Sequence, residues 1–394
     1  MSIAVSRRAQ RVKPSPTLAV TALANKLKAE GKDVIGLGAG EPDFDTPAHI
    51  GEAAIAAIRS GFTRYTNVDG IVELKDAIIA KFKRDNNIAY ERNQVMASTG
   101  GKQVIYNLCM ALLDPGDEVI IPAPYWVSYP DMVMLADGLP VTPDAGPEQG
   151  YKITPKQLAA SITAKTRLLL INSPSNPTGA AYTAAEWKAL GEVLLDHPRI
   201  VIGTDDMYEK IYWGAEPFCS LLTAVPELYD RTVTINGVSK AYAMTGWRLG
   251  YVAGPRPFIA QVEKVHSHSA TCATSFVQEA GVVALTGPQE FIGEMVVAWD
   301  RRRRAVASGL NNVKGITCPL VEGAFYAFPD IRATGMSSTE AADLLLREAH
   351  VALTPGVAFG EAGEGHLRLS FATSDEELAK AVERITNVLG AKSA

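Results

Sequence analysis

The most reactive side chain in the sequence is an amine in an apolar setting. Lys240 lies within residues 238–250, among glycine, aromatic and aliphatic neighbours. Burial there would disfavour the ammonium form, lower the pKa of Lys240 and leave the nucleophilic amine that Schiff-base chemistry requires. Arg248 follows in the same segment, and a buried guanidinium needs an anionic partner such as phosphate or carboxylate. Either residue alone could be a surface side chain, but the pair predicts a reactive amine beside an anion site.

A second group of polar side chains follows the apolar run IVIG. Asp205 and Asp206 come directly after it, and Tyr208 stands three positions beyond Asp205. A carboxylate at the end of a buried strand is unfavourable unless it meets a cation or hydrogen-bond donors. One of the two aspartates therefore either caps a following helix or faces a positively charged ligand. Tyr208 would share one side of a helical turn with Asp205.

Two glycine- and proline-containing segments could bind polar ligands. Gly101 and Lys102, in STGGKQ, stand at the start of a helical pattern, where free backbone N–H groups bind anions, although an ordinary glycine-rich helix start is the alternative. The P-loop spacing is absent. Asn176, in NSPSNPTG, is held by prolines where its amide could donate to a ligand, although turn chemistry alone also explains these residue types.

Two more segments, near the ends of the chain, complete the candidate site. Gly40 ends GLGAG, which is not a dinucleotide fingerprint because Pro42 and Pro47 enforce an extended loop where that motif needs a helix. This segment is either a turn or a place of close backbone approach. Arg368 lies in HLRLSF, on the strand face opposite the apolar residues, as either a solvent-exposed residue or a fork for a carboxylate.

Composition excludes several classes of protein. The chain has 394 residues, 47% hydrophobic and 21% charged, with a formal net charge of −5. This predicts a packed protein without a nucleic-acid or membrane footprint, and we interpret the basic run at residues 301–304 as a solvated or salt-bridged helix surface. We expect no metal site, since His266 and His268 have no suitably spaced third ligand. No secretory signal or C-x-x-C spacing is evident, so we expect a cytoplasmic location.

The order of the elements predicts an α/β fold. Helical patterns at 17–31, 48–60, 71–86 and 101–113 alternate with apolar strand-like runs such as DEVIIP, TRLLLINSP, RIVIGTDD, RTVTING and LGYVAG. Alternation of this kind favours a mainly parallel sheet covered by helices, with ligands bound beyond the carboxyl ends of the strands. A long helix over about 289–312 precedes a helix-strand-helix segment. We predict a large domain at 48–290 and a smaller one formed by 1–47 and 291–394.

Eight segments together resemble the class I (fold type I) pyridoxal-phosphate aminotransferases, and most closely their bacterial aspartate aminotransferase branch, which includes enzymes that also use prephenate. They occur in the family's order over nearly the whole chain: GAGEPDFDTP, YTNVDG, STGGKQ, PAPYWVSYP, NSPSNPTG, DDMYE, GVSKAYAMTGWRLGY and HLRLSFATS. The resemblance implies a large domain with a mainly parallel mixed sheet covered by helices, and a smaller α/β domain.

The resemblance also implies roles around pyridoxal 5'-phosphate. Lys240 would hold the cofactor as an internal aldimine and then shuttle the substrate's α-proton. Asp205 would pair with the pyridinium nitrogen, Tyr208 and Asn176 would donate to the phenolate oxygen and depress the imine pKa, and Trp126 would stack on the ring.

The phosphate would rest on the amides of Gly101 and Lys102 with Arg248 as its fork. In a homodimer with shared active sites, Tyr65 of the neighbouring subunit would reach the phosphate. The family's phosphate-binding serine is replaced by Gly237, so Ser239 is the possible substitute.

The amino acid and 2-oxo acid substrates would be held by both ends of the chain. Arg368 would bind the α-carboxylate with the help of the Gly40 backbone N–H, and closure of the smaller domain would exclude water. Lys102 and Ser15 would recognise the distal carboxylate. The segment between GAFYAFP and GVAFG, which helps to form the lid, is short.

The resemblance therefore implies transamination between aspartate or glutamate and a 2-oxo acid such as 2-oxoglutarate, in a ping-pong mechanism. A relative that prefers prephenate, or an aromatic or other amino acid, is the alternative, and a pyridoxal-phosphate lyase is another. Transcription regulators with this fold carry an extra helix-turn-helix domain, for which the chain has no spare length. An NAD-dependent oxidoreductase is disfavoured by the prolines that follow Gly40.

Overall fold

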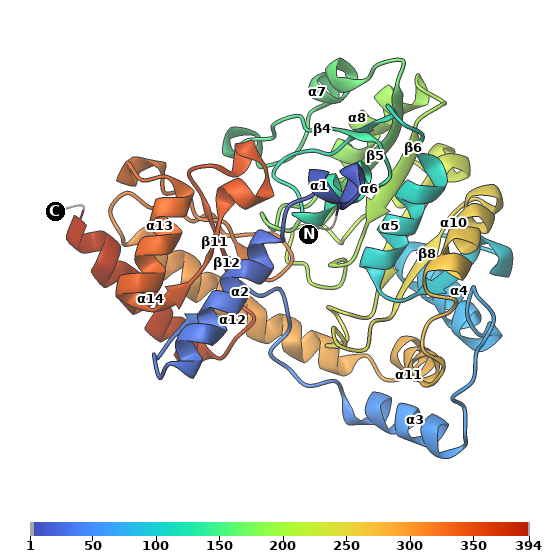
Figure 1. Cartoon of the computed structure of the whole chain (residues 1–394), viewed down its shortest axis with the longest axis horizontal. Helices are drawn as coiled ribbons and strands as arrows, with labels where there is room; N and C mark the ends of the chain where they lie inside the picture. The colour runs from blue at the N-terminus through green and yellow to red at the C-terminus, as the bar shows by residue number, and fades with distance from the viewer. Residues whose placement is uncertain (1–3, 393–394) are drawn as a thin grey trace.

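A seven-stranded mixed sheet forms the centre of the larger part of the molecule, in a computed structural model that describes residues 4–392 (Figure 1). Its strand order is β2-β8-β7-β6-β5-β3-β4. β8 pairs antiparallel with both neighbours, whereas the other pairings are parallel. The strands are β2 (Val95–Ser98), β3 (Glu118–Ile120), β4 (Leu139–Val141), β5 (Thr166–Asn172), β6 (Val201–Asp205), β7 (Thr232–Gly237) and β8 (Gly250–Ala253). The mainly parallel sheet expected from the sequence is confirmed.

Both faces of this sheet are apolar because helices cover both. Leu168 and Leu170 of β5 pack into one hydrophobic cluster, with α5 and α10, while Leu169 and Ile171 point to the opposite cluster. A strand buried on both sides reads as a continuous apolar run rather than an alternating one, as TRLLLIN does. The covering helices are α3 (Ala48–Arg59), α4 (Val72–Asn86), α5 (Gly101–Leu112), α6 (Ser128–Leu135), α7 (Pro155–Ser161), α8 (Ala184–Leu195), α9 (Leu221–Ala224), α10 (Arg256–Ser269) and α11 (Ser275–Thr286).

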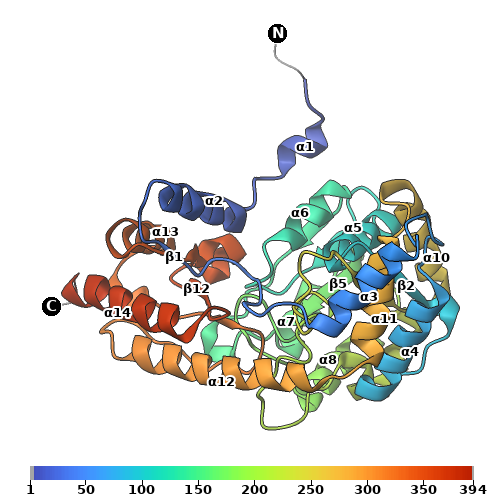
Figure 2. The ribbon, with the colours of Figure 1, turned by 90° about the horizontal axis from the view of Figure 1, so that it is seen from below.

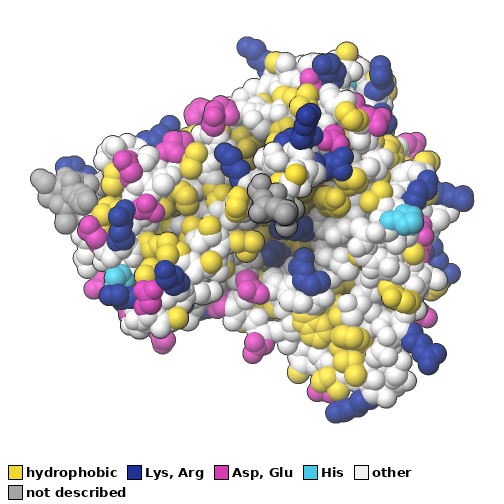
Figure 3. Space-filling view, in the orientation of Figure 1, with side chains coloured by type: hydrophobic (Ala, Val, Ile, Leu, Met, Phe, Trp, Pro, Cys, Tyr) yellow, Lys and Arg dark blue, Asp and Glu magenta, His cyan; other side chains and the backbone are white. Residues whose placement is uncertain are grey.

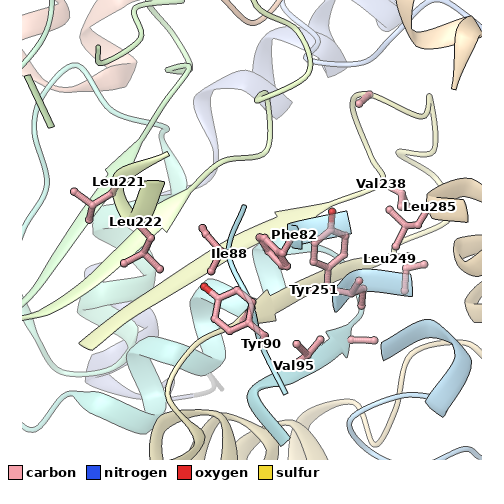
Figure 4. Packing of buried hydrophobic residues seen from close by; sticks show 14 of the residues in the cluster. Phe82, Ile88, Tyr90, Val95, Leu221, Leu222, Val238, Leu249, Tyr251 and Leu285 are labelled. Carbon is pink, nitrogen blue, oxygen red and sulfur yellow. The ribbon is translucent and has the colours of Figure 1, made fainter. Parts of the chain in front are cut away.

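The core on the α4 face is built from close aromatic packing (Figure 4). Phe82 of α4 lies between Tyr90 and Tyr251, with edge-on ring contacts at 5.2 and 5.9 Å between centroids. Leu249 and Leu285 pack into the same cluster. Fully burying side chains of this size contributes about 1.5–3 kcal/mol each, so this cluster holds the helices firmly against the sheet.

Residues 16–36 and 290–392 pack together on one side of the molecule, and we call this part the terminal lobe (Figure 2). The long helix α12 (Glu290–Asn311) lies against α14 (Asp375–Lys392), and α2 (Pro16–Ala29) packs on β10 through Ala24. The lobe contains the small sheets β1 (Ile35–Gly36) with β10 (Val351–Ala352), and β11 (Thr354–Pro355) with β12 (Leu367–Ser370) and β9 (Tyr326–Ala327). The lobe also contains α13 (Ser338–Leu344), whereas α1 (Arg7–Arg11) lies against α6 of the larger part, with Arg11 Nη2 2.9 Å from Asp137 Oδ1.

The basic run on α12 is salt-bridged. Arg301 pairs with Asp375, Arg302 Nη1 lies 2.9 Å from Asp43, and Arg303 and Arg304 pair with Asp300. The interpretation as a salt-bridged helix surface is confirmed for all four, although Arg302 and Arg303 are buried rather than solvated. Within residues 4–392, none of the helices has the length and apolar character needed to cross a membrane.

Candidate functional site

A cavity of about 490 Å³ lies where the larger part of the molecule meets the terminal lobe. Figure 3 shows this face hollowed between the two, with Lys and Arg side chains around the hollow. Asn172 and Asp205, the last residues of β5 and β6, line the cavity, so it lies at the carboxyl ends of the strands, as expected. Eleven of the residues singled out in the sequence line it: Gly40, Gly101, Lys102, Trp126, Asn176, Asp205, Tyr208, Ser239, Lys240, Arg248 and Arg368.

Asp205 is a buried carboxyl held by two donors. Its Oδ2 accepts a hydrogen bond from the hydroxyl of Tyr129 at 2.6 Å, and its Oδ1 accepts one from the backbone N–H of Met207 at 3.2 Å. Burial raises the pKa of Asp205 to about 6, although the Tyr129 hydrogen bond opposes the shift. A buried carboxylate of this kind stabilises a cationic ligand group.

The alternative of an aspartate that caps a helix is wrong. Residues 207–210 form a turn, not a helix. Asp206 does not line the cavity; it is buried beside Glu209 and Lys81, and this burial raises its pKa well above the ordinary value. Asp205 and Tyr208 do share the cavity side of the turn.

Lys240 stands opposite Asp205 with its amine in the cavity. Its Nζ donates to the carbonyl oxygen of Gly40 and lies 5.9 Å from the ring centroid of Phe325. Burial lowers the pKa of Lys240 to about 8; Glu41 counteracts the shift, and Arg368 and Arg248 add to it. About a tenth of the amine is therefore neutral and nucleophilic at pH 7, far more than for an ordinary lysine.

Arg368 is a buried cation with spare donors. It is 2% exposed on β12, so the solvent-exposed alternative is wrong. Its Nη1 donates to Oδ1 of Asn176 at 2.9 Å, and its Nη2 donates to the carbonyl oxygen of Gly38. Its Nε is buried without a hydrogen-bond partner in the described part of the chain. With no carboxylate among these partners, this guanidinium is suited to an anionic ligand.

The start of α5 forms a second anion-binding corner. Gly100, with φ 89°, caps the helix, and a Cβ there would lie 2.6 Å from Nη2 of Arg248. The glycine thus allows the guanidinium to approach the first backbone amides of α5. Lys102 reaches over the ring of Trp126, with Nζ 5.0 Å from the centroid. Burial and the nearby Arg248 lower the pKa of Lys102.

Position 237, where the resemblance implies a serine and this chain has glycine, offers little space. A Cβ at this position would lie 3.1 Å from both the Cα of Gly250 and the carbonyl oxygen of Leu249. The neighbouring strand therefore leaves little space for a side chain. Ser239 lines the cavity and is 6% exposed.

Two of the predicted site residues lie outside this cavity. Tyr65 is 86% exposed on the surface of the chain. Ser15 is bonded to the Thr17 hydroxyl, with 3.0 Å between the two oxygens, and it is Thr17, Leu18 and Thr21 of α2 that line the cavity. The roles assigned to Tyr65 and Ser15 stay predictions.

Sequence reasoning missed several polar residues of the site, among them three that hold other site residues in place. Tyr129 bonds to Asp205, Tyr326 bonds to Tyr208, and Asn172 bridges the backbones of Asp205 and Asn176. Tyr129 follows Trp126 by three positions on the segment PYWVSYP, and this spacing could have indicated a shared face. Tyr326 arrives from the terminal lobe, and nothing local in GAFYAFP points to the cavity.

Comparisons with known proteins find several that are similar over nearly the whole chain. Residues 32–385 match the family model "Aminotransferase class I and II". An aspartate/prephenate aminotransferase from Nitrosomonas europaea is 52% identical over 98% of this chain and 99% of its own. The solved aspartate aminotransferase from Rhizobium meliloti superimposes with a TM-score of 0.95 at 46% identity, over 98% and 99% of the two chains. The solved aspartate aminotransferase from Thermus thermophilus with maleate superimposes with a TM-score of 0.93 at 42% identity, over 98% of this chain and 100% of its own.

Proposed function

The chain belongs to the class I and II aminotransferases, and from this premise we propose that it moves an amino group from aspartate or glutamate to a 2-oxo acid such as 2-oxoglutarate. The cofactor would be pyridoxal 5'-phosphate, and the reaction would follow a ping-pong mechanism. The observation that carries the proposal is one cavity that holds the amine of Lys240, the carboxyl of Asp205 and the guanidinium of Arg368. The names of the relatives support aspartate as the amino donor.

The residues present fit pyridoxal phosphate. A phosphate suits the first amides of α5 beside Arg248, where a side chain at Gly100 would block the approach. A pyridinium nitrogen suits the buried carboxyl of Asp205, and an aldehyde suits the amine of Lys240. When bound, the cofactor supplies an aldehyde that accepts the amino group and a ring that withdraws electrons from the substrate's α-carbon.

Four side chains of the cavity would act on the cofactor or on the substrate's α-proton. Lys240, with a pKa of about 8, would take the proton from the substrate's α-carbon and deliver it to the carbon of the cofactor that receives the amino group. Asp205 stays ionised when it meets a cationic ring nitrogen, because the opposite charge lowers its pKa again. Asn176 uses its amide oxygen to accept from Arg368, which leaves its amide N–H groups to donate to the cofactor's phenolate oxygen together with the hydroxyl of Tyr208.

Substrate is oriented through its carboxylates. Arg368 would bind the α-carboxylate with its unpartnered Nε, next to the backbone of Gly40. Lys102 is the candidate for the distal carboxylate, since it faces the cavity over Trp126. Ser15 remains a second candidate, through movement of α2. This placement holds the α-hydrogen toward Lys240 and supplies the orientation that accelerates the proton transfer.

Prephenate is a second candidate acceptor, favoured by the names of two relatives, both aspartate/prephenate aminotransferases. Leu18, 67% exposed, and Ile105 line the same cavity, and they offer an apolar surface for a ring.

The proposal extends to assembly and location. Residues 48–290 would form the larger domain, and 1–47 with 291–394 the smaller, which closes on substrate. Two copies would form a dimer through the exposed apolar residues of α3, Ile55 and Ile58. Tyr65 of one copy would then reach the phosphate of the other through the groove of about 650 Å³ beside Arg248 and Trp247. The four unpaired cysteines suit a reducing cytoplasm.

A spectral titration of the purified protein with pyridoxal phosphate tests the function. We expect a visible absorption band that disappears when aspartate is added, and no such band in Lys240→Ala. Incubation with aspartate and 2-oxoglutarate should yield glutamate, whereas a lyase would yield none. A protein that stays colourless with the cofactor would overturn the proposal.

A further inference from the structure

Tyr326 is a buried residue of the cavity to which no task has yet been assigned. It lies on β9 of the terminal lobe, is 1% exposed, and lines the cavity. Its hydroxyl oxygen is 2.8 Å from that of Tyr208. Its ring faces the guanidinium of Arg368, with Cζ 4.6 Å from the ring centroid. Tyr326 thus touches both the tyrosine assigned to the cofactor and the arginine assigned to the substrate.

The direction of the hydroxyl–hydroxyl hydrogen bond follows from counting hydrogens. A tyrosine hydroxyl has one hydrogen to donate and two lone pairs to accept with. If Tyr208 donates its hydrogen to the cofactor's phenolate oxygen, it can only accept from Tyr326. The hydroxyl of Tyr326 must then be the donor, and this bond rotates the hydrogen of Tyr208 away from Tyr326 and into the cavity.

Gly40 gives Tyr326 the space for this arrangement. A Cβ at Gly40 would lie 2.2 Å from the hydroxyl oxygen of Tyr326 and 3.2 Å from its Cζ. The backbone of Gly40 is not in the left-handed region, so it is close approach rather than backbone conformation that calls for glycine. Any side chain there would push the hydroxyl of Tyr326 away from Tyr208.

We propose that Tyr326 is a positioning residue, whose hydroxyl donates to Tyr208 and directs the hydroxyl hydrogen of Tyr208 toward the cofactor. Its ring is held for this purpose between the guanidinium of Arg368 and the backbone of Gly40. The inference rests on the function proposed above, because that function places the phenolate oxygen in front of Tyr208. It adds a contact through which the terminal lobe, which carries both Tyr326 and Arg368, acts on the cofactor's surroundings.

Tyr326→Phe isolates the hydroxyl, since the ring remains against Arg368. The readout is the pH midpoint of the visible band of the bound cofactor, which a weaker donor at the phenolate oxygen moves upward. Besides Tyr326, the groups that act electrostatically on Tyr208 are Arg368 and Asp205, and both remain in the variant. We expect the pH midpoint to rise by about 0.5–1 pH unit, the size of one neutral hydrogen bond. The affinity for maleate, a dicarboxylate, should stay within about twofold of that of the unchanged protein, because Arg368 keeps its partners.

A double substitution separates positioning from a general disturbance. Tyr208→Phe should raise the midpoint further than Tyr326→Phe, and adding Tyr326→Phe to Tyr208→Phe should change nothing more, since the effect passes through the Tyr208 hydroxyl. An equal shift in both backgrounds, or no shift in Tyr326→Phe, overturns the inference. Absence of the band in the unchanged chain would instead overturn the proposed function.

A second measurement needs no cofactor. Gly40→Ala should lower the thermal unfolding midpoint of the cofactor-free protein by several degrees, because the new methyl group collides with the Tyr326 hydroxyl. Tyr326→Phe in the same chain removes the 2.2 Å collision and leaves the 3.2 Å contact, so it should restore most of the loss. If Gly40→Ala lowers the midpoint equally with and without the Tyr326 hydroxyl, the new methyl group does not collide with that hydroxyl. This result would overturn the packing on which the inference depends.

Discussion

The hydroxyl of Tyr129 and the carboxylate of Asp205, two residues that line the cavity, form a 2.6 Å hydrogen bond. The bond joins α6 to the end of β6, and the ring of Tyr129 packs edge-on against Trp126 at 5.3 Å between centroids. One oxygen of Asp205 is thereby held by Tyr129 and the other by the amide of Met207. Asp205, whose carboxylate would face the cofactor's nitrogen, is thus oriented by α6. This helix begins just after Trp126, which would stack on the ring.

Tyr129→Phe should shift the pH dependence of cofactor binding upward. Asp205 has a pKa of about 6, raised by burial and held down by the Tyr129 bond, so loss of the bond raises it further. Because the ionised form binds the cationic ring, affinity falls as the pH drops through this pKa. A hydrogen bond to a charged group contributes about 1.5–3 kcal/mol, equivalent to about 1–2 pH units.

Fluorescence titration with pyridoxal phosphate between pH 5 and 8 gives the inflection for each protein. Tyr125→Phe is the matched control, since Tyr125 neighbours Trp126 but does not line this cavity. An unchanged inflection in Tyr129→Phe would show that the hydroxyl does not support the carboxylate.

The amine of Lys240 should react with aldehydes at a rate that rises with pH and levels off above about pH 8, since its pKa is about 8 and the neutral form is the nucleophile. Glu41 raises this pKa, so Glu41→Gln should move the inflection to lower pH. Stopped-flow absorbance gives the rates, and borohydride reduction followed by peptide mass spectrometry identifies the modified lysine. Modification that persists in Lys240→Arg at the same rate would contradict the assignment.

Arg248→Gln and Gly100→Ala should both weaken the binding of pyridoxal phosphate and leave that of pyridoxal, which lacks the phosphate, nearly unchanged. The first variant removes a charged fork; the second places a methyl group 2.6 Å from Arg248 Nη2, on a backbone with φ 89°. Loss of one charge-assisted contact of about 1.5–3 kcal/mol corresponds to about 10–100-fold in affinity. Equal weakening for both ligands, measured by fluorescence titration, would place the phosphate elsewhere.

The sequence predicted the parts of this molecule whose causes are local. The run TRLLLIN predicts a strand buried on both faces, and the glycines before Lys102 predict a helix start; both are found. The amine of Lys240 was expected to have a lowered pKa from its apolar neighbours, and burial is indeed the main cause. The strand and the helix start depend on neighbouring residues, whereas the site of Lys240 also involves Gly40 and Phe325 from distant segments.

What sequence could not predict depends on contacts between distant segments. Tyr326 approaches Tyr208 across 118 positions of the chain, and no local pattern states that separation. The residue types alone left the choice between Asp205 and Asp206 open, and only the resemblance favoured Asp205. In the structure the turn at residues 207–210 directs Asp205 to the cavity and Asp206 into the core. The assignment of residues 1–47 and 291–394 to one smaller domain is still a proposal.

Mixed dimers test the shared site. In a pair of Lys240→Ala and Tyr65→Ala chains, one of the two sites would combine an intact Lys240 with an intact Tyr65 from the partner. After subunit exchange between the two variants, half of the dimers would be mixed, and each mixed dimer would carry one intact site out of two. The mixture should therefore reach up to about a quarter of the activity of the unchanged protein. Activity that never exceeds the mean of the separate variants would show that Tyr65 does not act across a dimer.

A buried ion pair holds the turn that carries the site. Lys81 of α4, 0% exposed, pairs with Glu209, which follows Tyr208 in the chain, and Lys81 Nζ also donates to Asn86 at 2.8 Å. Lys81→Met leaves the Glu209 carboxylate buried without its cation, so the free energy of unfolding should fall by about 3–5 kcal/mol.

Urea unfolding of the cofactor-free protein measures this loss. Adding Glu209→Gln to Lys81→Met removes the uncompensated charge and keeps an oxygen for the Asn86 amide, which donates to Glu209 at 3.0 Å. We expect the double variant to regain at least half of the stability. Lys83→Met is the matched control, since Lys83 is exposed on the same helix and donates to Asn87, and it should change the unfolding free energy by no more than about 0.5 kcal/mol. A Lys81→Met loss as small as that of the control would mean that the pair contributes nothing to the turn, and that Asp205 and Tyr208 are held by the sheet alone.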